Sequence, residues 1–169
     1  MWRRDLERNT DERSLVGAFK AFVTSSGFSV LVRVRFAARW RLSRSPLLRT
    51  LSLLASRSVV RSFGCYISPL SDIGEWLCLP HPVAIVIGDG AVIGNDATIY
   101  QGVTIGRKDE GVPEYPVIGD RVIVYCGATL LGKIRIGPGA IIAAHSVVLD
   151  DVPAGARVAG TPARIVTSN

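Results

Sequence analysis

With 169 residues, of which 48% are hydrophobic and 20% charged, the chain is long enough for one domain, or a domain with an arm, and apolar enough to bury a core. It lacks the uninterrupted apolar run of ~18 residues that a membrane span needs, and Arg3 and Arg4 are followed by acidic residues, unlike a signal peptide. Three cysteines without CxxC spacing, Cys65, Cys78 and Cys126, predict neither a disulfide framework nor a zinc site and indicate a reducing cytoplasm.

The positive charge is concentrated at one end of the chain. The formal net charge is +6, but residues 1–61 hold 13 of the 20 basic residues and 4 of the 14 acidic ones, a net charge of +9. The rest of the chain is therefore slightly acidic. A basic segment of this kind either contacts an anionic surface or is simply solvated.

Residues 10–64 carry the signals of three helices. Thr10 is a candidate N-cap, and the apolar residues between positions 15 and 23 follow helical spacing. A second helix is expected from Phe28 to Leu42. Ser45, followed by a proline in the first turn, begins a third helix that ends at Gly64.

From position 67 onward, aliphatic residues recur every six positions. Neither the period of a helix nor the alternation of a flat sheet explains this spacing. It is typical of a parallel β-helix of hexapeptide repeats, in which each short face points one aliphatic side chain inward. With about 18 residues per coil, residues 67–150 build about four to five coils. The repeating positions are Ile67, Ile73, Leu79, Ile85, then Ile87, Ile93, Ile99, Ile105, and finally Ile118, Val124, Leu130, Ile136, Ile142 and Val148.

The repeat is interrupted twice. A two-residue shift separates Ile85 from Ile87, just after His81, and a polar segment at 107–117 breaks the period a second time. The polar segment is expected to loop out of the coil. Because binding and catalytic residues concentrate on loops held by a rigid scaffold, the two interruptions are the candidate functional regions.

The N-terminal helices have two interpretations. The end of a β-helix exposes unpaired backbone groups, so the apolar stripes of the helices are expected to cover the open end, with the arginines solvated. Alternatively, the basic arm makes a peripheral contact with the inner face of an anionic membrane. Nucleic acid is not expected as a partner, because no aromatic residues are interleaved with the basic ones. The predicted division is a basic α-helical arm or cap at 1–64 and a β-helix at 65–169, with the loop 107–117 and a C-terminal tail.

The chain has two histidines. His81 lies between two prolines at the first interruption, where an irregular corner lets its side chain project outward and act as a general base at neutral pH. The alternative is an ordinary surface histidine. His145 falls in a regular corner and is expected to be structural. Two histidines cannot supply a three-histidine zinc site, so no metal is predicted.

Four stretches carry a family resemblance: HPVAIVIG at 81–88, QGVTIG at 101–106, GATLLG at 127–132 and AGTPARIV at 159–166. With them, residues 67–166 resemble the left-handed parallel β-helix acyltransferases of hexapeptide repeats, in the serine acetyltransferase-like branch. The resemblance implies left-handed coils, a homotrimer, and acetyl-CoA as co-substrate in grooves between neighbouring prisms, with no metal.

The resemblance also implies roles for individual residues. His81 matches the catalytic base that takes the proton of an acceptor hydroxyl, and Tyr66 is the candidate to orient it. Acceptor binding falls to Gln101 and Tyr115. The residues that match the acetyl-CoA track, from the pantetheine arm to the nucleotide end, are Gly106, Cys126, Gly127, Ala144, Thr161, Pro162 and Arg164.

The chain departs from the family pattern around the histidine. Serine acetyltransferases carry one aspartate fifteen residues before it, where Tyr66 stands, and another directly before it, where Pro80 stands. A second histidine that holds the amino-acid acceptor is best matched by Tyr115. The ammonium group of serine needs carboxylates nearby, so these departures resemble the short family members associated with surface-polysaccharide assembly.

The predicted function is therefore a cytoplasmic, acetyl-CoA-dependent O-acetyltransferase with a small acceptor, a sugar or polysaccharide precursor. The alternative acceptor is L-serine, as in cysteine biosynthesis. A hypothesis of another class is a non-catalytic β-helical scaffold whose basic arm binds a membrane or a partner.

Overall fold

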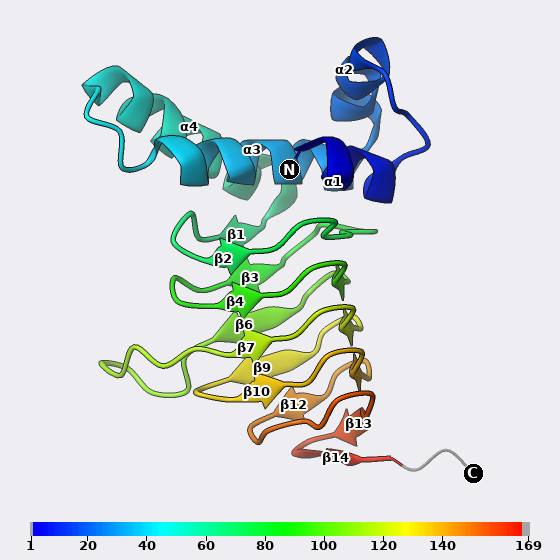
Figure 1. Ribbon diagram of the computed structural model, residues 1–169. Helices are drawn as coiled ribbons and strands as arrows, with labels where there is room; N and C mark the ends of the chain where they lie inside the picture. Colours follow the sequence, from blue (N-terminus) through cyan, green and yellow to red (C-terminus); the bar gives the residue numbers. More distant parts are fainter. Residues whose placement is uncertain (1, 167–169) are drawn as a thin grey trace.

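The computed structural model describes residues 2–166. Helices lie across one end of a stack of coils, and the strands step away from them to β14 at the other end (Figure 1). The helices are α1 Trp2–Asn9, α2 Leu15–Thr24, α3 Ser26–Trp40 and α4 Pro46–Phe63. Among the described residues, no single helix is long and apolar enough to cross a membrane. The pair of α2 and α3 has the length and composition of a membrane span, but the two helices are bent by 106° relative to each other.

The helix ends follow the chemistry of their caps. Ser14 accepts a hydrogen bond from the Gly17 amide and begins α2, whereas the prediction of Thr10 as this cap was wrong. The hydroxyl of Thr10 instead donates to the carbonyl of Leu6 at 2.8 Å, just after the end of α1, a helix that the sequence did not predict. The third predicted helix is confirmed as α4, which ends at Gly64 in the left-handed conformation (φ 62°).

Within residues 2–166, fourteen short strands form three sheets that enclose a prism. Sheet A has the order β1-β3-β6-β9-β12, sheet B the order β10-β7-β4-β2, and sheet C the order β14-β13-β11-β8-β5. All pairings are parallel except the terminal hairpin of β13 and β14. The strands are β1 Tyr66–Ile67, β2 Asp72–Ile73, β3 Val86–Ile87, β4 Val92–Ile93, β5 Thr98–Ile99, β6 Thr104–Gly106, β7 Val117–Ile118, β8 Ile123–Val124, β9 Thr129–Leu131, β10 Arg135–Ile136, β11 Ile141–Ile142, β12 Val147–Val148, β13 Arg157–Gly160 and β14 Ala163–Ile165.

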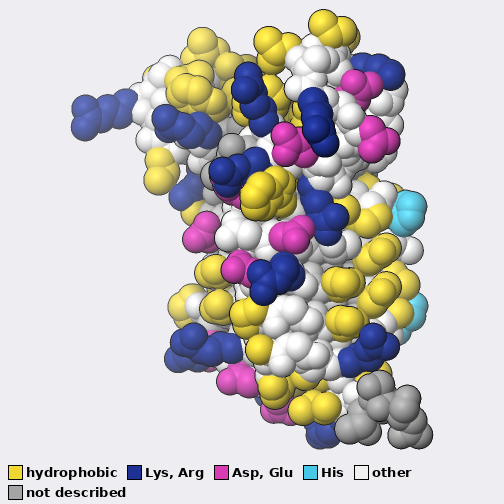
Figure 2. All heavy atoms as spheres, turned by 45° about the vertical axis from the view of Figure 1, so that its right-hand side comes forward, with side chains coloured by type: hydrophobic (Ala, Val, Ile, Leu, Met, Phe, Trp, Pro, Cys, Tyr) yellow, Lys and Arg dark blue, Asp and Glu magenta, His cyan; other side chains and the backbone are white. Residues whose placement is uncertain are grey.

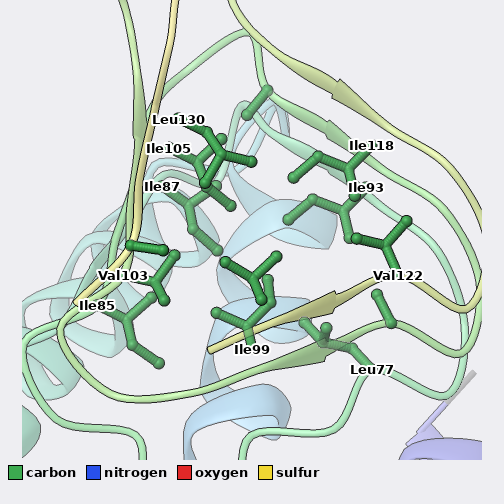
Figure 3. Close-up of a cluster of buried hydrophobic side chains, with 14 of the residues drawn as sticks. Leu77, Ile85, Ile87, Ile93, Ile99, Val103, Ile105, Ile118, Val122 and Leu130 are labelled. Atoms are coloured by element: carbon green, nitrogen blue, oxygen red, sulfur yellow. The ribbon is translucent and has the colours of Figure 1, made fainter. Parts of the chain in front are cut away.

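The aliphatic ladder forms the core of the prism. Ile87, Ile105 and Leu130 are paired in register along sheet A, and Figure 3 shows them stacked beside the Ile93–Ile118 pair of sheet B. All five side chains are buried. The predicted left-handed parallel β-helix with an α-helical N-terminal arm is confirmed. The chain between β6 and β7 leaves the prism as a long loop (Figure 1), as the broken period predicts.

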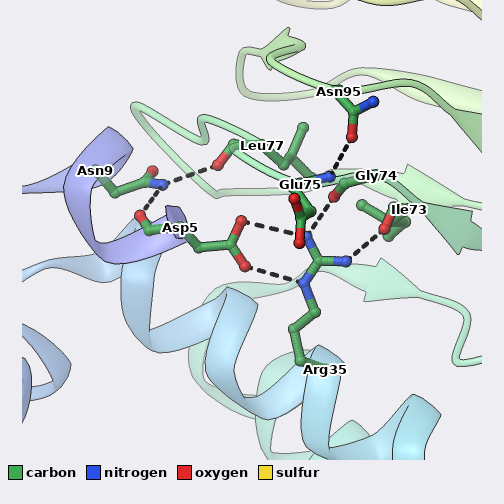
Figure 4. A network of polar contacts seen from close by, with 8 residues as sticks. All are labelled: Asp5, Asn9, Arg35, Ile73, Gly74, Glu75, Leu77 and Asn95. Atoms are coloured by element: carbon green, nitrogen blue, oxygen red, sulfur yellow. Dashed lines mark hydrogen bonds and ion pairs between the residues drawn. The ribbon is translucent and has the colours of Figure 1, made fainter. Parts of the chain in front are cut away.

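Polar groups of the helices satisfy the open backbone of the first coil (Figure 4). Arg35 donates to the carbonyls of Ile73 and Gly74 and forms a 2.9 Å ion pair with the buried carboxylate of Asp5. Asn9 donates to the carbonyl of Leu77 at 2.8 Å. The helices therefore cover this end of the prism through hydrogen bonds to its unpaired groups.

The apolar stripe of α2 does not cover the coil, contrary to the prediction. Leu15, Val16, Phe19 and Val23 are between 69% and 81% exposed, and the buried residues of α2 are the small Gly17 and Ala21. Figure 2 shows hydrophobic and basic side chains side by side on the outside of this helical layer. The packing of α2 against α3 uses Ala21 and the partly buried Ala18 and Phe22, which leaves the other large residues of α2 in solvent.

Candidate active site

His81 lies where the first coil passes from sheet C into sheet A. The corner between the bridge residue Cys78 and β3 is longer than the corresponding corners of the later coils, between β5 and β6 and between β8 and β9. Inside this corner, the carbonyl of His81 accepts a 2.8 Å hydrogen bond from the Val83 amide. The His81 side chain is exposed. Within residues 2–166, its imidazole makes no hydrogen bond or ion pair, so its ring nitrogens are open to a ligand.

Backbone hydrogen bonds connect the corresponding corners of successive coils along one edge of the prism, which we call the CA edge. The Gly102 amide donates to Val83, the Gly127 amide to Gln101 and the His145 amide to Cys126, each at 2.9 Å. The hydroxyl of Thr161 reaches the carbonyl of His145 at 3.4 Å. The CA edge therefore brings together most of the predicted site residues: His81, Gln101, Cys126, Gly127, Ala144, Thr161 and Pro162.

Gly106 and Tyr115 lie on a different edge, between sheets A and B, which we call the AB edge. The carbonyl of Gly106 accepts from the Gly132 amide at 3.0 Å. The ring of Tyr115 packs so closely on Gly88 and Gly90 that a Cβ atom on either glycine would lie 2.4 Å from it. Tyr115 thus anchors the loop, and a single chain does not bring it to His81.

Arg164 lies at the far end of the prism, on the terminal hairpin. Its guanidinium is exposed and lies 3.4 Å from the carboxylate of Asp150. Its strand, β14, ends the coil stack opposite β2 and β3, between which His81 lies in the chain (Figure 1), as residues for the two ends of an extended ligand would be.

Tyr66 begins sheet A directly beside the strand that follows His81. Its amide donates to the carbonyl of Ile85 at 2.8 Å, and Tyr66 pairs with Val86. The side chain is 52% exposed. No hydrogen bond joins its hydroxyl to His81 in the described part of the chain, so the predicted orienting contact is not formed in this structure.

Two tyrosines on the CA edge were missed from the sequence. The rings of Tyr100 and Tyr125 stack with centroids 5.2 Å apart and planes 14° from parallel. Each tyrosine directly precedes a predicted site residue, Gln101 or Cys126. The signal in the sequence was an aromatic residue at the equivalent position of two successive coils. The loop inserted between the two coils obscured this equivalence.

Two of the cysteines, Cys65 and Cys78, are not placed as nucleophiles. Burial raises the pKa of the Cys65 thiol, and burial, partly opposed by Arg8, raises that of Cys78. A raised pKa lowers the thiolate fraction at neutral pH and therefore the reactivity. Among residues 2–166, no group of three or more His, Cys, Asp or Glu side chains is placed to hold a metal ion.

Comparisons with known proteins agree with this architecture. The family model of the bacterial transferase hexapeptide (six repeats) matches residues 115–150. A serine acetyltransferase of Bacillus licheniformis is 38% identical over 154 residues, which cover 89% of this chain and 68% of that protein. The chain belongs to the serine acetyltransferase-like branch of the hexapeptide-repeat acyltransferases.

Further members of this family match nearly the whole chain. Serine acetyltransferase 2 of Arabidopsis thaliana is 36% identical over 168 residues, 97% of this chain but 50% of that protein. The chain thus spans about half the length of the first curated relatives that it matches.

Solved structures of the family superpose on both the helices and the prism. The soybean serine acetyltransferase apoenzyme has a TM-score of 0.83 and 38% identity, covering 96% of this chain and 66% of that one. A serine acetyltransferase in complex with CoA has a TM-score of 0.81 and 32% identity, covering 98% and 68%.

Proposed function

We propose that this family member is an acetyl-CoA-dependent O-acetyltransferase in which His81 is the general base. The observation that carries the proposal is that His81 is exposed on the first coil of the CA edge. The later corners of the same edge carry Gln101, Cys126, Gly127, Ala144 and Thr161. An extended thioester lying along this edge would bring its acetyl group towards the histidine. Relatives named as acetyltransferases, one of them solved with CoA, support the same reading.

The proposed reaction needs one proton acceptor and no metal. The imidazole of His81 takes the proton of an acceptor hydroxyl as the oxygen attacks the thioester carbonyl carbon. Backbone amides of the coil stabilise the negative charge that develops on the carbonyl oxygen. The tetrahedral intermediate collapses, the thiolate of coenzyme A leaves, and His81 returns the proton to its sulfur.

L-serine is the first acceptor to test. The relatives reported above are all named serine acetyltransferases, which favours serine over the sugar hydroxyl predicted from the sequence. A sugar hydroxyl is the second candidate, because Tyr66 and Pro80 stand where serine acetyltransferases carry an aspartate, so carboxylates near the ammonium group of serine are missing. The test is release of coenzyme A thiol with serine and with a panel of sugars. Activity on serine alone rejects the sugar. If none of the acceptors causes release of the thiol, acetyl transfer is rejected altogether.

We infer that the acceptor site is completed by a second copy of the chain. Tyr115 and His81 lie on the two opposite edges of sheet A, and three prisms side by side would bring the AB edge of one copy to the CA edge of the next. For the proposed homotrimer, light scattering should give a mass of about 54 kDa, three times the 18.1 kDa of one chain. A fully active monomer would reject it.

We also propose that the enzyme works at the cytoplasmic side of a membrane, with the outer face of α2 against anionic lipid. Val16 and Phe19 are 81% and 74% exposed there, on a strongly basic segment. The test is sedimentation with phosphatidylcholine vesicles with and without phosphatidylglycerol. Val16→Ser with Phe19→Ser should abolish binding to the anionic vesicles, whereas Val112→Ser in the loop should not. Equal sedimentation of all three proteins rejects the contact.

A further inference from the structure

A groove of about 820 Å³ lies between α4 and the first coil. Arg49 and Arg57 of α4, with Arg41 at the end of α3, line its helical side. Tyr66 and Ser68 line the side formed by the prism. This volume is typical of a small-molecule site, and L-serine would fill only a small part of it.

The charge of the groove is unbalanced. Residues 13–71 contain ten basic residues and no aspartate or glutamate, and the one carboxylate in the lining is that of Asp89. In the described chain, none of the three guanidinium groups forms an ion pair or a side-chain hydrogen bond. Guanidinium groups gathered in a concave site without partners fit an anion, and phosphate oxygens match their geometry best.

The groove runs across sheet A from Tyr66 towards Asp89, and its Tyr66 end is the one nearer to His81, which does not itself line it. The segment that leads from α4 into β1 runs along the segment that follows His81, since the Ala84 amide donates to Phe63 and the Tyr66 amide to Ile85. Tyr66 belongs to both neighbourhoods, because it lines the groove and pairs with β3. A ligand in the groove could therefore extend past Tyr66 towards His81.

We propose that the groove binds the phosphate of a phosphorylated acceptor, such as a glycosyl phosphate, whose free hydroxyl is acetylated at His81. This inference rests on the proposed acetyltransferase function and names the class of its acceptor. Arg49 and Arg57 hold the phosphate, since residues eight apart lie on one face of a helix. Arg61 continues the same row one turn farther but lies outside the groove, which makes it a matched control.

Calorimetric titration with N-acetylglucosamine 1-phosphate, N-acetylglucosamine and inorganic phosphate tests the groove without any catalysis. The sugar phosphate should bind more tightly than the other two probes. Arg49→Ser with Arg57→Ser should weaken its binding at least ~10-fold, and Arg61→Ser should leave it unchanged. Unchanged binding in the double variant, or an equal loss in Arg61→Ser, overturns the proposal. Tighter binding of inorganic phosphate than of the sugar phosphate also overturns it, because the site then recognises a free anion.

Kinetics with the same variants separate this proposal from the function on which it rests. The double variant should raise the KM for the sugar phosphate and leave kcat and the KM for acetyl-CoA unchanged. Acetyl transfer to serine that does not depend on Arg49 and Arg57, with no binding of the sugar phosphate, overturns the groove and keeps the enzyme. Arginine-dependent binding without transfer to any acceptor supports the groove and rejects the enzyme.

Discussion

The ring of His145 lies directly against Gly127, so that a Cβ atom on Gly127 would be 2.4 Å from Nδ1 of the histidine. Both residues have positive φ, 67° for Gly127 and 57° for His145. His145, whose side chain is otherwise exposed, therefore packs on Gly127 at the CA edge. The contact also fixes the shape of the edge along which acetyl-CoA is proposed to lie.

Gly127→Ala should destabilise the protein and raise the KM for acetyl-CoA. The left-handed backbone costs an alanine about 1–2 kcal/mol, and displacing the ring of His145 costs ~1 kcal/mol more. Gly139→Ala is the matched control, because Gly139 has φ 70° and no atom of the described residues lies within 4 Å of the new Cβ. Urea unfolding should show the larger loss for Gly127→Ala, and adding His145→Ala should bring it to the level of the control. Equal losses in the two single variants would refute the contact.

Arg35→Leu should cost ~3 kcal/mol of unfolding free energy. The change leaves the carboxylate of Asp5, which is 1% exposed, without its partner, and it removes the donors to the carbonyls of Ile73 and Gly74. Arg39→Leu, an exposed arginine on the same helix, should change stability by no more than about 0.5 kcal/mol. The comparison is made by urea unfolding. A loss as small as that of Arg39→Leu would show that the ion pair does not hold the helices on the prism.

Tyr66→Phe should change kcat by less than about 3-fold, because its hydroxyl makes no hydrogen bond to His81. Tyr66→Ala should instead raise the KM for the acceptor, since the ring lines the groove. Steady-state kinetics of the two variants separate these effects. A large fall of kcat in Tyr66→Phe would restore the orienting role predicted from the sequence.

Cys126 should be the first thiol to react with iodoacetamide in the folded protein. The pKa values of Cys65 and Cys78 are raised by burial, so their neutral thiols persist to higher pH than that of a free cysteine and react slowly. Desulfo-coenzyme A, which has no thiol of its own, should protect Cys126 if it lies on the CA edge. Peptide mass spectrometry reads both results, and labelling of Cys126 that the ligand does not slow would place the ligand elsewhere.

The prism could be predicted because its signal is local and repeated. Each inward position needs an aliphatic side chain, so the period alone gave the register of Ile87, Ile105 and Leu130. Helix α1 could not be predicted, because its eight mostly polar residues are held by distant partners, Arg35 and the carbonyl of Leu77. The outward face of α2 was missed for the same reason, since helical spacing does not say which neighbour a stripe will meet.

The site was predictable to the extent that it follows the repeat. Residues at equivalent corners must align, so the period predicts that Gln101 and Cys126 share an edge. The arginine groove could not be predicted, because it depends on where α4 crosses the first coil. The position of Tyr115 depends on how the loop folds back on Gly88 and Gly90, which no period encodes.

The central claim is that His81 is the base of an acetyl transfer. The most direct measurement is kcat/KM for acetyl-CoA in the wild type and in His81→Ala, with the best acceptor of the panel and with CoA binding checked by calorimetry. We expect a loss of at least ~100-fold with unchanged CoA affinity, the usual contribution of a general base. A loss of only a few-fold would contradict the assignment, and a wild type without any transfer would favour the non-catalytic scaffold.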